Sequence, residues 1–167
     1  DLRLLESLVL EKIETCKAYI AEMNFTKLKV ELQNIFIYNL EGVKGSETLY
    51  FYKALDDLHD GKSVEEYMEN FSDNIKSDVE WVQNYLKNPE PIKAYSLGKY
   101  CIEIQLLVID KMFSVQLWAS VYSLCKEILS DESLEVTDTI RLYYGLTAFN
   151  LQKYDESFYI LNDLYQK

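Results

Sequence analysis

The sequence predicts an all-α fold of about nine helices, arranged as antiparallel hairpins in series. Apolar residues recur at three- and four-residue spacing along most of the 167 residues, which is the period of an amphipathic helix. The alternation of apolar and polar residues that is typical of β-strands is missing almost everywhere. Short polar segments separate the helical stretches, and short connections favour antiparallel neighbours. The length predicts a single domain over residues 1–167.

The first half of the chain predicts five helices. A first pair is expected over Leu2–Met23 and Thr26–Leu40, because apolar side chains recur on one face of each stretch. A third helix is expected over Ser46–Leu58. A short fourth helix opens at Ser63, and a fifth extends over residues 72–87.

The second half begins at Asn88–Pro91, where two prolines end the fifth helix. A strongly apolar helix is expected over Ile92–Met112, buried on much of its circumference, and another over Phe113–Leu129. Thr137 or Asp138 is expected to cap the next helix, because either side chain can accept a hydrogen bond from a first-turn amide.

The most specific pattern lies in Arg141–Lys167, which reads as two short helices folded back on each other. The turn is expected at Gln152–Tyr154. Gly145 and Ser157 are small, as required where two helices approach closely, and the ring of Tyr154 is expected to close the turn. The residues expected to pack this hairpin are Gly145, Ala148, Tyr154, Ser157, Leu161 and Leu164.

In these residues the hairpin resembles a tetratricopeptide (TPR) repeat. It departs from that family at Tyr144, where leucine is usual, and at Ser157, where alanine is usual. A looser likeness covers Tyr19–Ile35, and residues 60–95 do not fit a 34-residue register. The resemblance implies a TPR-like right-handed α-α superhelix, a class of scaffold that binds proteins and often belongs to a multi-protein assembly. Another all-α array or bundle is the alternative.

The formal net charge of −11 repels phosphate backbones and anionic lipid headgroups. It therefore argues against binding to nucleic acid or to a membrane surface as the main function. No apolar run reaches the ~18 residues of a membrane-spanning helix, so we expect no membrane insertion. The acidity has two interpretations, namely a solvated surface that keeps the protein soluble and an acidic groove for a basic peptide.

The three cysteines, Cys16, Cys101 and Cys125, are far apart in sequence and each lies within an apolar helical pattern. We expect free, buried thiols and an intracellular location, in cytoplasm or nucleus, where thiols stay reduced. The chain begins at Asp1 rather than at methionine, which suggests a piece of a longer protein.

A search for catalytic and metal-binding patterns yields little. His59 is the one histidine and lies near Asp56, Asp57 and Asp60, but zinc sites need several nitrogen or sulfur ligands and the spacing is not that of a calcium loop. A solvated helix end is the favoured interpretation. We expect no catalytic residues, no cofactor and no metal.

The sequence therefore predicts a non-catalytic protein-interaction scaffold that docks a protein partner, for example through a basic or helical segment. Two alternatives stay open. One is a structural module that forms a homodimer or filament, with the C-terminal hairpin as a candidate contact, and the other is an all-α enzyme that uses carboxylates or a metal. The residues expected to bind the partner are Tyr143, Tyr144, Phe158, Tyr159, Tyr165 and Trp81.

Overall fold

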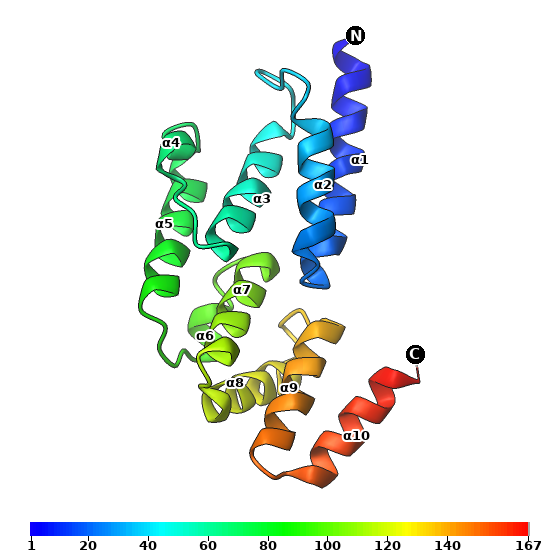
Figure 1. Ribbon diagram of the computed structural model, residues 1–167, viewed down its shortest axis with the longest axis vertical. Helices are drawn as coiled ribbons and strands as arrows, with labels where there is room; N and C mark the ends of the chain where they lie inside the picture. The colour runs from blue at the N-terminus through cyan, green and yellow to red at the C-terminus, as the bar shows by residue number, and fades with distance from the viewer. Residues whose placement is uncertain (167) are drawn as a thin grey trace. The chain divides into compact units, whose positions relative to one another are not determined.

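The computed structural model describes residues 1–166, and the described chain is all-helical, with ten α-helices and no strand (Figure 1). The expectation of an all-α fold is confirmed at this level. Two compact units divide the chain, Asp1–Gln83 and Asn84–Lys167. Helices α1–α4 and most of α5 belong to the first unit, and α6–α10 belong to the second.

In the first unit, α1 (Leu2–Ala21), α2 (Phe25–Ile35) and α3 (Ser46–His59) pack against one another (Figure 1). Their shared core is made of apolar side chains spaced three and four residues apart, including Val9, Cys16, Ile20, Leu28, Leu32, Ile35, Leu49 and Leu55. Ion pairs connect the helices at the edge of this core, with Lys12 Nζ 2.6 Å from Glu31 and Lys29 Nζ 2.6 Å from Asp56. The unit continues through α4 (Glu65–Met68) into α5 (Asp73–Lys87).

In the second unit, the expected long helix over Ile92–Met112 is wrong. The structure has a one-turn helix, α6 (Ala94–Leu97), followed by a break and then α7 (Ile102–Ser114). At the break, a Cβ atom on Gly98 would lie 3.0 Å from Leu134 Cδ2, so the absent side chain lets a distant residue pack there. The Tyr100 carbonyl, freed from any helix, accepts a hydrogen bond of 2.8 Å from the Gln105 side chain.

The same break corrects the expectation for one cysteine. Cys101 stands at the N-cap position of α7 with extended backbone and is exposed, whereas Cys16 and Cys125 are buried; all three are free thiols. Local periodicity could not reveal this difference, because all three residues lie in apolar stretches.

The expected helix over Phe113–Leu129 begins later than predicted, because its first residues belong to α7 and to a turn. α7 ends at Ser114, Gln116 has a left-handed φ of 66°, and α8 extends over Trp118–Ser130. α9 (Asp138–Asn150) follows, and Thr137 caps it by accepting a hydrogen bond of 3.2 Å from the Ile140 amide. The prediction that Thr137 or Asp138 caps this helix is thereby confirmed in favour of Thr137.

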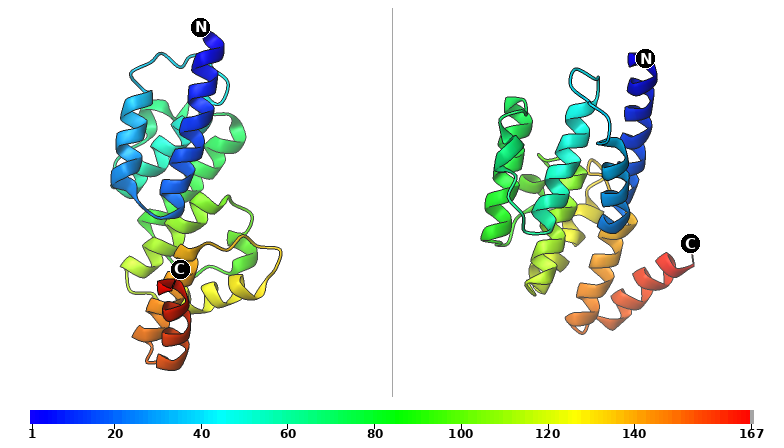
Figure 2. Two further views of the ribbon diagram at one scale, coloured as in Figure 1. Left: turned by 90° about the vertical axis from the view of Figure 1, so that its right-hand side faces the viewer. Right: turned by 45° about the horizontal axis from the view of Figure 1, so that its top comes forward.

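α10 (Tyr154–Tyr165) returns beside α9 as an antiparallel hairpin, which Figure 2 shows from two further directions. The turn between them contains Gln152, whose left-handed φ of 63° reverses the chain. Tyr154 is the first residue of α10 rather than part of the turn. α9 lies between α8 on one side and α10 on the other, and it also contacts α7.

Substitution of Gly145, in the middle of α9, tests how tightly the hairpin is packed. A Cβ atom there would lie 2.5 Å from Leu161 Cδ2 and 2.8 Å from Ile160 Cγ2. Helix propensity alone predicts that Gly145→Ala stabilises the protein by about 1 kcal/mol, whereas overpacking costs about 1–3 kcal/mol. We expect net destabilisation in urea unfolding followed by circular dichroism. Ser123→Ala, at an exposed position of α8, serves as the control and should change stability by less than about 0.5 kcal/mol. A more stable Gly145→Ala variant would contradict the close approach.

Candidate functional site

The two facing sides of the α9–α10 hairpin meet at small residues. The Ser157 hydroxyl donates a hydrogen bond of 2.9 Å to the Gly145 carbonyl oxygen, and Ala148 is fully buried beside this contact. Leu161 fills the space above Gly145, and Leu164 is half-buried at the far end of α10. This arrangement fixes which side of α10 turns toward α9 and therefore which side remains available.

The first turn of α10 is held to α8 and α9 by a shared carboxylate. Glu156 Oε2 accepts hydrogen bonds from the Tyr122 hydroxyl at 2.5 Å and from the Tyr144 hydroxyl at 2.7 Å, and the two rings stack with centroids 5.3 Å apart. The ammonium groups of Lys126 and Lys153 lie 5.5 Å and 5.3 Å from the centre of the Tyr122 ring. These hydroxyls, with Tyr122 contributing most, lower the pKa of Glu156 below its usual range because they stabilise the charged form.

Two of the tyrosines expected to bind a partner belong instead to the interior of the second unit. Tyr143 is buried and its hydroxyl donates to Asp110 on α7, so the expectation that it is exposed is wrong. Burial, followed by the hydrogen bond to Asp110, raises the pKa of Tyr143. Tyr144 is half-buried and its hydroxyl is engaged by Glu156. Both rings are needed where α9 meets its neighbours, which a local sequence pattern does not show.

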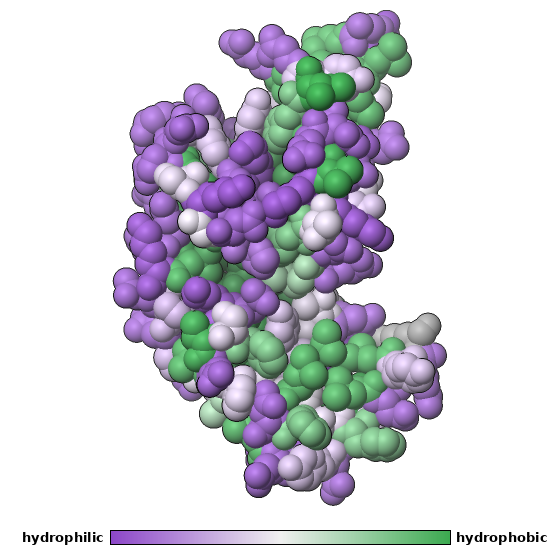
Figure 3. Space-filling model, in the orientation of Figure 1, coloured by the Kyte–Doolittle hydropathy of each residue, from purple (hydrophilic) through white to green (hydrophobic). Residues whose placement is uncertain are grey.

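Beside the α9–α10 contact, the hairpin carries an open apolar groove of about 530 Å³. Figure 3 shows hydrophobic residues gathered over α9 and α10. The exposed fractions are large for aromatic residues, 71% for Phe158 and 90% for Tyr165, with 57% for Phe149 and 55% for Tyr154. The groove is lined by Phe149, Tyr154, Ser157, Phe158, Leu161, Asn162 and Tyr165.

Helical spacing explains why these residues share one face. The lining residues from α10 stand at positions i, i+3, i+4, i+7, i+8 and i+11 counted from Tyr154, which is one continuous stripe of an α-helix. Phe149, in the last turn of α9, also lines the groove. Its ring meets the Tyr154 ring edge-on, with centroids 5.4 Å apart. α10 therefore has two adjoining apolar stripes, one against α9 and one lining the groove, and Ser157 and Leu161 belong to both.

Sequence reasoning identifies only part of this groove. Phe158 and Tyr165, both among the residues expected to bind a partner, line it, whereas the sequence pattern places Tyr154 in the turn and Phe149 is not among the expected site residues. It gives no indication of Asn162. The second stripe of α10 is the available signal, because one helix that needs a single buried face seldom carries two.

The remaining expected partner-binding residues lie elsewhere. Tyr159 is 78% exposed on α10 but is not part of the groove lining, since it is rotated about 100° around the helix from Phe158. Trp81 is half-buried on α5 in the first unit. The groove, rather than the full expected set, is the site that the structure defines.

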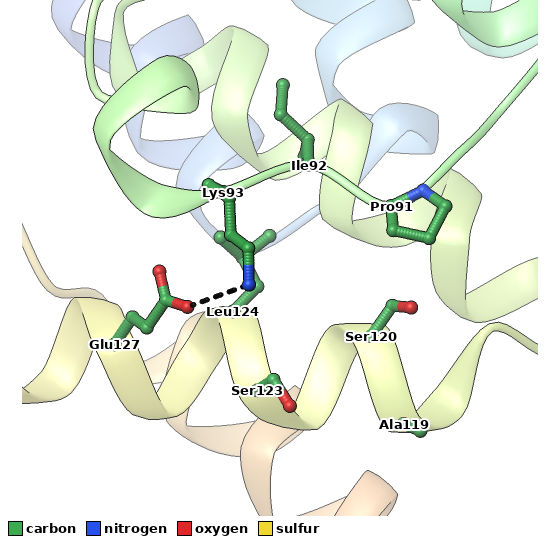
Figure 4. Close-up of a pocket in the computed structure, with 8 residues that line it drawn as sticks. All are labelled: Pro91, Ile92, Lys93, Ala119, Ser120, Ser123, Leu124 and Glu127. Atoms are coloured by element: carbon green, nitrogen blue, oxygen red, sulfur yellow. Dashed lines mark ion pairs between the residues drawn. The ribbon is translucent and has the colours of Figure 1, made fainter.

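A second hollow, of about 250 Å³, lies between the segment Pro91–Lys93 and α8 (Figure 4). Ser120 and Ser123 line it from α8, and its one carboxylate is already engaged. Glu127 accepts a hydrogen bond of 3.1 Å from the Ala94 amide and lies 3.9 Å from Lys93 Nζ. These contacts fix the start of α6 to α8, so the hollow is a structural junction.

The acidic cluster around His59 is an ion-pair network. Lys29 Nζ contacts Asp60 at 2.8 Å in addition to Asp56, while Asp57 pairs with Lys53 at 2.9 Å. Burial raises the pKa of Asp56, and the hydrogen bond from Lys29 lowers that of Asp60. The His59 ring stacks on Phe25 with centroids 4.0 Å apart. Across residues 1–166, no group of three His, Cys, Asp or Glu side chains is arranged to hold a metal ion.

Comparisons of the chain with protein families, with curated proteins and with solved structures find no match. The described helices include none that is both long and apolar enough to cross a bilayer. The groove is therefore the feature from which a function can be inferred.

Glu156 gives the site a testable pH dependence. Its pKa is lower in the folded protein than its ordinary value of 4.5, so its contribution to stability is present above that value and is lost as the pH falls through the folded pKa. We expect Glu156→Gln to lose about 1 kcal/mol at pH 7, because the side chain is only half-buried and the charged hydrogen bonds are partly screened.

Urea unfolding at a series of pH values measures this loss. The difference between the wild type and Glu156→Gln should shrink below about pH 4.5. Asp155→Asn, also in the first turn of α10 but exposed, is the matched control. A constant difference across this pH range would show that the carboxylate does not anchor α10.

Proposed function

We propose that the protein is a non-catalytic, TPR-like interaction scaffold of a multi-protein assembly and that the α9–α10 groove binds a helical segment of a protein partner. The supporting observation is the second apolar stripe of α10, which leaves Phe158 and Tyr165 largely exposed beside Phe149 and Tyr154. Exposed apolar residues scattered singly are ordinary on proteins, but a continuous aromatic patch marks an interaction site.

The shape of the groove favours a helix as its occupant. An amphipathic helix presents side chains at i, i+3, i+4 and i+7, and these enter a groove formed between two other helices. The α9–α10 pair offers this geometry because α10 contacts α9 on one side only and its lining residues form a continuous stripe. Aromatic residues also dominate the binding energy of protein interfaces.

The composition of the groove agrees with binding rather than with catalysis. Its lining residues are aromatic and aliphatic, with one serine hydroxyl, one amide and the phenol hydroxyls of Tyr154 and Tyr165, and none of them is a carboxylate, an amine, an imidazole or a thiol. The hydroxyl of Ser157 already donates to Gly145. General acid–base or nucleophilic chemistry would require a titratable group and a nucleophile within hydrogen-bonding reach.

Quantitative affinity capture tests the proposal. We expect Phe158→Asp and Tyr165→Asp to weaken binding of a stoichiometric partner by at least about tenfold, because each introduces an unpaired charge into the contact. Tyr159→Asp is the matched control, since it places the same charge on the same helix outside the groove. Circular dichroism checks that all three variants stay folded. If the three variants capture every protein equally well, the groove is not the binding site.

A further inference from the structure

We propose that the helix occupying this groove is α10 of a second copy of the chain, packed antiparallel across a two-fold axis. This inference rests on the proposed protein-binding function of the groove and names its partner. It would make the protein a homodimer with an isologous interface, in which the same patch serves both copies.

The apolar residues of the stripe are spaced symmetrically along α10. Tyr154 and Tyr165 stand at its two ends, and Phe158 and Leu161 each stand four residues inside an end, whereas Ser157 is buried and bonded to Gly145. A two-fold contact requires that residue i meets residue j and that j meets i, so an antiparallel pairing places Tyr154 against Tyr165 and Phe158 against Leu161.

This register makes specific pairs across the interface. Phe158 lies opposite Leu161 of the second copy near the axis. Tyr154 lies opposite Tyr165 of the second copy. The ends of α10 are separated by about 16 Å along its axis, which sets the length of the contact.

This pairing also gives a contact to Tyr165, the most exposed aromatic residue of α10. Phe149 and Tyr154 meet edge-on and form an aromatic corner at the turn end of the groove. Tyr165 is 90% exposed at the opposite end. In the antiparallel register, Tyr165 of each copy enters the aromatic corner of the other, and aromatic contacts of this kind add to the energy of area burial.

The charges are compatible with this pairing. No lining residue is charged, and Asp155 and Asp163 on α10 lie outside the lining. Antiparallel helices place the positive N-terminal end of each dipole, with Lys153 beside it, next to the negative end of the other. The net charge of −11 on each copy opposes association over long distances, and salt screens that repulsion beyond about 8–10 Å.

The available area predicts a weak dimer. The exposed fractions of the four aromatic residues amount to about 500 Å² per copy if each ring carries about 200 Å² of accessible surface. The resulting interface of about 1,000 Å² is at the lower limit for specific association. We therefore expect a dissociation constant in the micromolar range, about 1–100 µM.

Sedimentation velocity from about 1 µM to about 1 mM tests the dimer. We expect a monomer–dimer equilibrium that Phe158→Asp and Tyr165→Asp weaken by at least about tenfold and that Tyr159→Asp leaves unchanged within about twofold. Association should strengthen as salt is raised, because salt screens two acidic copies; a complex between an acidic and a basic protein would weaken. Circular dichroism establishes the fold of each variant.

A mixing experiment tests the register. Tyr154→Lys and Tyr165→Glu should each weaken self-association, whereas an equimolar mixture should associate again, because the introduced lysine of one copy then faces the introduced glutamate of the other. A mixture of Tyr154→Lys with Tyr154→Glu is the control and should not recover, because residues 154 of the two copies do not face each other in the antiparallel register. Recovery in both mixtures would overturn the antiparallel register.

The outcomes separate this inference from the proposed function. A strict monomer at about 1 mM, or a dimer that Phe158→Asp and Tyr165→Asp do not weaken, overturns the inference. If such a monomer still captures a different protein through Phe158, the proposed function stands and only the second copy is rejected. If neither self-association nor capture depends on Phe158, both fail.

Discussion

At Gly145 the side chains of Leu161 and Ile160 on α10 pack so closely against the backbone of α9 that a Cβ atom there would lie 2.5–2.8 Å from them. This contact determines the rotation of α10 about its axis, because Ser157 and Leu161 must face the glycine. Once that face is fixed, the stripe containing Phe158 and Tyr165 turns outward. The exposed groove is therefore a direct result of packing on the adjoining face of the same helix.

The second determinant is electrostatic and acts at the first turn of α10. Glu156 accepts hydrogen bonds from two tyrosine hydroxyls, one on α8 and one on α9. Its negative charge lies near the positive N-terminal end of the α10 dipole. The small-residue contact sets the rotation, whereas the carboxylate sets which end of α10 is held most firmly. Beyond that turn, the extensive contacts of α10 are with α9.

Periodicity predicted that the chain is helical, but it missed breaks in the second unit and most contacts between helices. The all-α fold and the C-terminal hairpin follow from local patterns, because each depends on residues three or four positions apart. Gly98, at the break after Leu97, lies against Leu134, and the hydroxyl of the buried Tyr143 donates to Asp110, 33 residues away. Such contacts have no local signal. The same limit applies to the groove, since two apolar stripes are visible in α10 but only the packed structure shows which one is covered.

The lining of the groove combines apolar rings with polar atoms. Tyr154 and Tyr165 are largely exposed and carry hydroxyl groups at the tips of their rings, and Asn162 adds an amide. Water can hydrogen-bond to these groups, so this face is partly hydrated although it is rich in aromatic residues. Phenylalanines at the two tyrosine positions would offer a similar area without that solvation. The tyrosines therefore bear on colloidal behaviour, because they lower the tendency of an exposed aromatic face to precipitate.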